Sequence, residues 1–421
     1  MKHLLLLLFI GSTSFLFGQA PDGFPSTFTS NGNGNWNGAI WTLVSGSDPD
    51  GPDGDDYVII AGNDVDVTAN AGFGHLEYSA SGPAQPTLTI NTGMSLTGYD
   101  TDEDGAITLT ANGALLGTKT LTLNIEGGTA SCTSLTISTT KASGIALLNI
   151  KDGGTLTVEN DLTVDSFEDD TDVQLDATVG TGNTLNLGGA IIGIDLDKGI
   201  IDMGSSAGVS TFNFNGSAAQ TIPFDDPTDL IYSDIQVSNP DNAILGSGLL
   251  STNVTGNLTI SAGGVFSDGV FSNVFTGDIT NAGTYNGTGA LTLTGNLTNS
   301  VGGIYNDGGS GTMINGDITN AGTYNGQSGS LDISGDFTNS GTFTSAGCNI
   351  NIAGNWNNTG TYTYFSGDNV TFDGAGVSTI TGATDWYELT ADKPGLTISS
   401  GAQNIHGILD LDQGTFISGG L

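Results

Sequence analysis

The chain has 421 residues, of which 44 are acidic and 6 are basic, so its formal net charge at neutral pH is −38. This charge disfavours nucleic acids and anionic membranes as partners, because both are bound through clustered cations. Neutral glycans, cell surfaces and dissolved cations remain compatible with it.

Residues 1–20 have the form of a secretory signal peptide. Met1-Lys2-His3 precedes an apolar run from Leu4 to Ile10 that is too short to span a bilayer, and cleavage fits after Gly18 or Ala20. No later run reaches the roughly 18 apolar residues that a membrane span needs. We therefore expect a mature chain that is secreted or held on the outer cell surface, without a transmembrane segment.

Residues 21–55 form a lead-in that is rich in Gly and Asn and contains two indoles, Trp36 and Trp41. We expect it to cap the open end of a column of strands, because an uncovered edge recruits other chains. Residues 56–205 then alternate apolar and polar side chains at uneven spacing. This pattern predicts short strands in irregular coils that carry acidic loops.

Residues 206–421 contain the most regular part, where one short phrase recurs between positions 256 and 374. Its copies open with glycines that lie 18 to 21 residues apart, namely Gly256, Gly277, Gly295, Gly316, Gly335 and Gly354. A fixed period of about 20 residues is typical of a solenoid. Because apolar and polar residues alternate within the phrase, we expect an all-β fold, a right-handed parallel β-helix solenoid with about 20 residues per coil.

Superposing the phrases aligns three sets of side chains. An apolar set is expected to point inward, and an asparagine set to bond from coil to coil. An aromatic set is expected to stack in the core, with a sugar-binding stripe as the alternative. The apolar set is Leu258, Ile279, Leu297, Ile318, Phe337 and Trp356; the aromatic set is Phe266, Tyr285, Tyr305, Tyr324, Phe343 and Tyr362; the asparagine set is Asn281, Asn299, Asn320, Asn339 and Asn358.

A longer repeat also spans the second half of the chain. The segment from Phe212 to Ile222 matches the segment from Val370 to Ile380, so a module of roughly 150 residues begins again before Leu421. We therefore expect either that the sequence is a truncated part of a longer protein or that its last coils are exposed. Cys132 and Cys348 lie too far apart along such a column for a disulfide, and we expect Cys348 to be buried.

The lead-in GNGNWNGAIW and the segment GNWNNTGTYTYFSGDNVTFDGAGVSTITG resemble large secreted repeat proteins of bacteria that use the type IX secretion system, many of them adhesin-like. The resemblance covers nearly the whole mature chain. It implies a surface scaffold and carries no catalytic residue across. The sequence departs from that family in lacking a C-terminal sorting domain.

One acidic stretch has the spacing of a calcium loop. Asp100, Asp102 and Asp104 place carboxylates at alternate positions before the turn-forming Gly105, which makes calcium the candidate cofactor. The acid that normally closes such a loop is missing, because Ala111 occupies the twelfth position. The alternative is a solvated acidic corner. Two further acidic clusters, at positions 48–56 and 165–172, have weaker spacing.

We predict no catalytic residue. Parallel β-helices include polysaccharide lyases and glycosidases, but this chain has no Arg, and only His75 and His406 remain after the signal peptide. The adjacent pairs Asp55-Asp56 and Asp225-Asp226 lie beside Pro or Gly, where surface turns are expected.

The resulting expectation is a secreted, non-catalytic, adhesin-like scaffold that contacts glycans or cell surfaces. A carbohydrate-active β-helix enzyme is the alternative. An ice-binding solenoid is a third hypothesis, which needs stacked hydroxyl groups. Thr-x-Thr pairs such as Thr87-Leu88-Thr89 and Thr292-Leu293-Thr294 do not recur at one position of every phrase, which disfavours that hypothesis.

Overall fold

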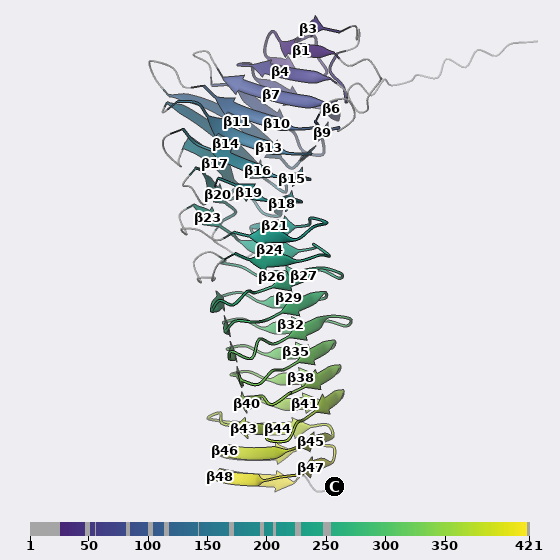
Figure 1. The fold of residues 1–421 in the computed structure, drawn as a ribbon, viewed down its shortest axis with the longest axis vertical. Coiled ribbons are helices and arrows are strands. Elements are labelled where there is room, and N and C mark those ends of the chain that lie inside the picture. Colours follow the sequence, from purple (N-terminus) through teal and green to yellow (C-terminus); the bar gives the residue numbers. More distant parts are fainter. Residues whose placement is uncertain are drawn as a thin grey trace, which may run out of the picture.

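The structure, a computed structural model, describes residues 26–46, 51–54, 56–80, 85–99, 104–112, 118–141, 143–167, 172–193, 198–204, 208–223, 229–246 and 254–418. Its named elements are all strands, and they stack in parallel along a tall, narrow column (Figure 1). The expected parallel β-helix is therefore confirmed.

Two sheets belong to the N-terminal coils alone. The first ends on an antiparallel pair, β1 with β3, while its other neighbours pair in parallel. In order, its strands are β3 (Trp41–Ser45), β1 (Thr27–Ser30), β4 (Tyr57–Ala61), β7 (His75–Ala80), β10 (Ile107–Ala111), β13 (Leu135–Thr139), β16 (Leu162–Asp165) and β19 (Ile191–Ile192). The second sheet consists of β2 (Gly34–Asn35), β5 (Val65–Val67), β8 (Thr87–Ile90), β11 (Lys119–Glu126), β14 (Gly144–Lys151), β17 (Val173–Asp176), β20 (Ile200–Asp202) and β23 (Leu230–Ile231).

A third, long sheet continues from the N-terminal coils to the C-terminal ones. Its strands are β6 (Ala71–Phe73), β9 (Ser95–Gly98), β12 (Thr129–Cys132), β15 (Thr155–Val158), β18 (Asn183–Leu187), β21 (Ser210–Phe214), β24 (Asp234–Val237), β26 (Leu258–Ile260), β29 (Ile279–Asn281), β32 (Leu297–Asn299), β35 (Ile318–Asn320), β38 (Phe337–Asn339), β41 (Trp356–Asn358) and β44 (Val377–Thr381).

A branch of this sheet lines another side of the C-terminal coils: β28 (Asn273–Phe275), β31 (Leu291–Leu293), β34 (Thr312–Ile314), β37 (Ser330–Ile333), β40 (Asn349–Ile352) and β43 (Asn369–Phe372). The long strand β46 (Glu388–Ile398) pairs with both β43 and β44, and β48 (Leu409–Ser418) pairs with β46. The remaining side holds β22 (Gln220–Ile222), β25 (Ala243–Leu245), β27 (Val265–Ser267), β30 (Thr284–Asn286), β33 (Ile304–Asn306), β36 (Thr323–Asn325), β39 (Thr342–Thr344), β42 (Thr361–Thr363), and the pair β45 (Thr384–Trp386) and β47 (Gln403–Ile405).

The length of a coil differs between the two halves of the column. In the coils from β26 to β44, which we call the regular coils, hydrogen-bonded asparagines of adjacent coils lie 18 to 21 residues apart. In the N-terminal half, Asn186 bonds Thr157 across 29 residues and Asn213 bonds Asn186 across 27. The expected period of about 20 residues therefore holds only for the regular coils, because the N-terminal coils have longer strands and loops.

The apolar set and five of the six aromatic residues lie inside the column, as expected, whereas Tyr362 is partly exposed. Every member of the apolar set is fully buried. In the aromatic set, Tyr285 and Tyr305 stack with ring centroids 4.5 Å apart, and Tyr305 and Tyr324 with centroids 4.8 Å apart. The alternative of a sugar-binding aromatic stripe is wrong for these rings, because Phe266, Tyr285, Tyr305, Tyr324 and Phe343 are at most 1 % exposed.

The asparagine set forms a buried ladder, which we call the inner asparagine ladder. Each side-chain amide donates to the side-chain carbonyl of the next coil, at 2.9 Å from Asn281 to Asn299 and 2.7 Å from Asn299 to Asn320. The second hydrogen of the same amide reaches a backbone carbonyl, as from Asn320 to Thr342 at 2.9 Å. Buried polar groups that are satisfied in this way add specificity to the stacking.

The corner before each strand of the long sheet explains the opening Gly and Asp or Asn of every phrase. A Cβ atom on Gly295 would lie only 2.4 Å from the carbonyl oxygen of Gly277, so the coils approach too closely for a larger residue. The next residue accepts a backbone amide of the following coil, as Asp317 accepts from Asp336 at 2.7 Å. Many of the carboxylates in the regular coils therefore have a structural role.

Both cysteines are free and buried, as expected for Cys348. Burial raises the pKa of the Cys132 thiol well above its ordinary value, and it raises that of the Cys348 thiol to about 12. Neither sulfur atom is therefore poised to react as a thiolate.

Removing one amide from the inner asparagine ladder should destabilise the column. In Asn320→Ala, Asn299 loses its acceptor and Asn339 loses its donor, so we expect the free energy of unfolding to fall by about 1–3 kcal/mol. Urea denaturation followed by circular dichroism measures this loss. The matched control is Asn325→Ala, which removes a partly exposed amide from the outer face of the same coil. An equal loss in both variants would contradict a special role for the buried ladder.

Candidate functional site

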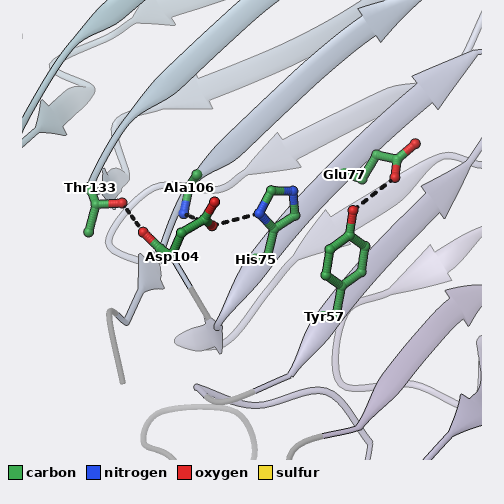
Figure 2. Close-up of polar contacts among 6 residues, drawn as sticks. All are labelled: Tyr57, His75, Glu77, Asp104, Ala106 and Thr133. Carbon is green, nitrogen blue, oxygen red and sulfur yellow. Dashed lines mark hydrogen bonds and ion pairs between the residues drawn. The ribbon is translucent and has the colours of Figure 1, made fainter. Parts of the chain in front are cut away.

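The first candidate site is a cluster on the outer face of β4 and β7, shown in Figure 2. Parallel pairing sets Tyr57 beside His75, and their rings stack with centroids 4.5 Å apart and planes 10° apart. The Tyr57 hydroxyl donates to Glu77 at 3.1 Å, and Nδ1 of His75 lies 2.6 Å from a carboxylate oxygen of Asp104. The strands thus bring one phenol, one imidazole and two carboxylates together.

Asp104 is held firmly although its side chain is 63 % exposed. Its carboxylate accepts from the backbone amide of Ala106 at 3.0 Å, and its backbone carbonyl accepts from the Thr133 hydroxyl. Partial burial acts to raise the pKa of Asp104, but the hydrogen bonds from His75 and Ala106 outweigh it and lower this pKa below its ordinary value. Asp104 is therefore ionised at neutral pH.

The contact with Asp104 orients the imidazole of His75. A carboxylate at Nδ1 favours the tautomer that carries its hydrogen on that atom, which leaves Nε2 as the acceptor. In this arrangement His75 can accept a proton or bind a metal ion through Nε2. The sequence signal was weak, because His75 and Asp104 lie 29 residues apart and belong to no repeated phrase.

The structure places only one residue of the predicted calcium loop. Asp100 and Asp102 lie outside the described residues, whereas Asp104 is directed towards His75. Over the described ranges, no group of three or more His, Cys, Asp or Glu side chains could hold a metal ion. The calcium site therefore stays a prediction, and its remaining ligands would have to come from the undescribed positions beside Asp104.

The other acidic positions of interest also lie partly within and partly outside the described residues. Within the cluster at 48–56, Asp56 is fully buried, and its carboxylate accepts backbone amides from Ser26 and Asp53, both at 2.8 Å. This carboxylate therefore ties the first strand to the next coil. Asp55, the pair Asp225-Asp226 and most of the cluster at 165–172 lie outside the described residues.

Several buried carboxylates were missed by the sequence reasoning, and two of them accept hydrogen bonds from core tyrosines. Asp268 accepts a hydrogen bond from the Tyr285 hydroxyl at 3.1 Å, and Asp307 accepts one from Tyr324 at the same distance. Thr312 also donates to Asp307, at 2.6 Å. The signal was present, because each Asp stands two residues after an inward aromatic residue and therefore points to the same side of the strand.

A buried lysine is the third feature that the sequence did not reveal. Lys393 on β46 is 2 % exposed and donates to the carbonyl of Ala353 at 2.8 Å and to the hydroxyl of Ser378. Burial lowers the pKa of its ammonium group. Ser378 is itself buried and donates to the carbonyl of Gly354 at 2.5 Å, so both side chains are enclosed by the coil backbone.

Shallow grooves occur on the C-terminal coils. One, of about 320 Å³, lies over β34, β37 and β40, where Asp332, Asn351 and Asp373 face it. The Asn351 amide donates to Asp332 at 2.5 Å. A second groove, of about 350 Å³, lies between β42 and β47 and is lined by Tyr362, Asp385 and Asn404.

Hydroxyl groups do stack on the outside of the column, which corrects one expectation. Thr292 itself is no part of such a stack, because it lies between Val274 and Met313. On the long sheet, however, single threonines recur in register in successive coils: Thr259, Thr280, Thr298, Thr319 and Thr338. These threonines form no Thr-x-Thr pairs, because each of these short strands has only one outward residue.

Comparison of the chain with protein-family models, with curated proteins and with solved structures found no match. The part of the chain that the structure describes contains no helix that is long and apolar enough to cross a membrane.

Calcium should stabilise the N-terminal coils if the acidic loop binds it. A ligand that binds only the folded state raises the melting temperature, so we expect a higher value in calcium than in chelator. In Asp104→Asn this difference should shrink, whereas the exposed control Asp412→Asn should keep it. Equal melting curves of the unmodified protein in calcium and in chelator would refute the site.

The buried carboxylate of Asp307 should make stability depend on pH. Burial raises its pKa above the ordinary value despite the hydrogen bonds from Thr312 and Tyr324. Its stabilising contribution is therefore complete below the ordinary carboxyl pKa of about 4 and is lost as the pH rises through the raised value.

Asp307→Asn keeps an acceptor oxygen but cannot ionise, so the variant should gain stability relative to the unmodified protein as the pH rises from about 4 to 8. Melting temperatures measured across this range give the difference. A difference that does not change with pH would contradict the raised pKa.

Proposed function

We propose that the protein is a secreted, non-catalytic, adhesin-like scaffold that holds repeated contact surfaces outside the cell. The proposal rests on the hydrogen bonds that the carboxylates of the protein accept. In the regular coils they accept backbone amides at corners, as Asp278 does from Asn296 at 2.7 Å, or phenol hydroxyls in the core. Side chains that a hydrolase needs for acid and base chemistry are here engaged in joining one coil to the next.

The shape of the column supports the same role. The coils stack in register along one axis (Figure 1), so residues at equivalent outward positions follow one another from coil to coil. Repeated weak contacts combine into strong attachment when their spacing is fixed. Neutral glycans and cell surfaces are the proposed partners, because a chain of net charge −38 repels polyanions.

The proposal also includes export of the protein from the cell. Residues 1–20 would direct the chain to secretion, and the resemblance to type IX secretion cargo supports the outer surface as its location. Calcium bound near Asp104 is the proposed cofactor.

Carbohydrate cleavage is the second candidate, and one observation favours it. The His75–Asp104 contact beside Tyr57 and Glu77 resembles a general base with its orienting carboxylate on an exposed face. The site would lie on the irregular N-terminal coils, where loops can enclose a substrate.

A panel of neutral and acidic glycans separates the two candidates. We expect the purified protein to be retained on some neutral glycans or on whole cells, with no release of oligosaccharides. Release that disappears in His75→Gln, while the melting temperature is unchanged, would establish the enzyme instead. No retention on any glycan or cell would refute the adhesive contact.

A further inference from the structure

An unbroken line of polar, uncharged side chains runs along the outer face of the long sheet. Backbone pairing places one such residue of each coil directly over that of the next, from β9 to β44. We call this line the polar column. Its members are Thr97, Ser131, Thr157, Asn186, Asn213, Gln236, Thr259, Thr280, Thr298, Thr319, Thr338, Asn357 and Thr381.

The polar column faces solvent, since each of its members is partly or fully exposed. In the described structure, the five threonines from β26 to β38 have no side-chain hydrogen-bond partner, so their hydroxyl groups are available to an outside ligand. No member carries a charge, although the chain as a whole has a net charge of −38.

A second line doubles the polar column on the N-terminal coils. There each strand of the long sheet is long enough to present two outward residues, and the second line consists of Ser95, Thr129, Thr155, Thr184 and Thr211. Hydroxyl and amide groups therefore form a two-dimensional array on β9, β12, β15, β18 and β21. The spacing is about 4.8 Å between coils and about 6.6 Å along a strand.

The interior of the column keeps this face regular. Sheets of many strands normally twist, and flat ones depend on stacking or on side-chain ladders. In the regular coils, both devices operate directly beneath the polar column. Phe337 stacks on Trp356 with ring centroids 4.4 Å apart, and the inner asparagine ladder joins the same strands.

We propose that the polar column binds ice. Hydroxyl groups fixed at a constant repeat hold their first-shell waters at the same repeat, and an ice crystal presents water molecules at regular positions. The threonine methyl groups beside the hydroxyl groups exclude other arrangements of water. Each coil contributes little, but the contributions of successive coils add because the spacing is rigid.

The composition of the face favours ice over a glycan as the occupant. Protein sites for sugars commonly use exposed aromatic rings, whereas the polar column contains none and five of the six rings of the aromatic set are buried. A biological role in ice binding rests on the proposed export, since ice forms outside the cell, but binding itself does not depend on it.

Incorporation of the full chain into slowly grown ice tests the proposal. We expect enrichment in the ice fraction relative to a non-binding protein of similar size. In the double variant Thr298→Tyr, Thr319→Tyr, two bulky rings interrupt the polar column, and enrichment should fall to the level of the reference protein. The matched control is Met313→Tyr, because Met313 points outward from β34 on a different face and is 45 % exposed. Melting temperatures show whether each variant is folded.

Each of the following results would overturn the proposal. The unmodified protein could be excluded from ice like the reference, or the double variant could be retained as well as Met313→Tyr. A double variant that fails to fold would be replaced by Thr298→Val, Thr319→Val, which keeps the shape and removes the hydroxyl groups; undiminished enrichment would then refute hydroxyl-templated binding. Retention on a neutral glycan that the tyrosine variant loses, with exclusion from ice, would assign the face to the proposed adhesion instead.

Discussion

Hydrogen bonds between the buried amides of the inner asparagine ladder set the register on which the rest of the column depends. An amide such as that of Asn320 donates to Asn339 in the next coil and to the backbone of Thr342, while its carbonyl accepts from Asn299. Slipping one strand by a single residue would bring an amide against an apolar side chain and leave it unsatisfied in the core. Apolar burial alone permits several registers, because many apolar residues fit the same space.

Because the register is fixed, residues at the same position of successive phrases lie directly above one another. Inward aromatic residues of adjacent coils then stack on one another, and corner carboxylates accept hydrogen bonds from backbone amides of the next coil. A compact column can carry the net charge of −38 because the carboxylates at the corners are spaced along the column. Each of them faces the dipole of a backbone amide. The outward threonines follow the same register without contributing to it, which leaves them available for contacts outside the molecule.

The sequence predicted the parts of the structure that recur. The inner ladders could be read directly, because residues such as Tyr285 and Tyr305 occupy the same place in consecutive phrases of nearly constant length. The coil length of the N-terminal half could not be predicted from the sequence, because strands as long as β11 and loops of variable length obscure the period there. Strand parity would have placed Asp268 and Asp307 in the core, because each follows an inward aromatic residue by two positions.

The candidate sites were less predictable for a geometric reason. His75 and Asp104 meet because β7 begins beside the loop before β10, a contact that no spacing rule describes. The polar column changes residue type between Thr, Ser, Asn and Gln, so it becomes visible only when strand pairing aligns Thr157 with Asn186 and Gln236 with Thr259.

Solution X-ray scattering by the full chain tests the central claim most directly, which is that one continuous column carries all of these faces. A column of stacked coils gives a rod-like profile, with a constant cross-section and a maximum dimension several times larger than its width. A compact, near-spherical profile, or one that separates into independent globular bodies, would contradict the account.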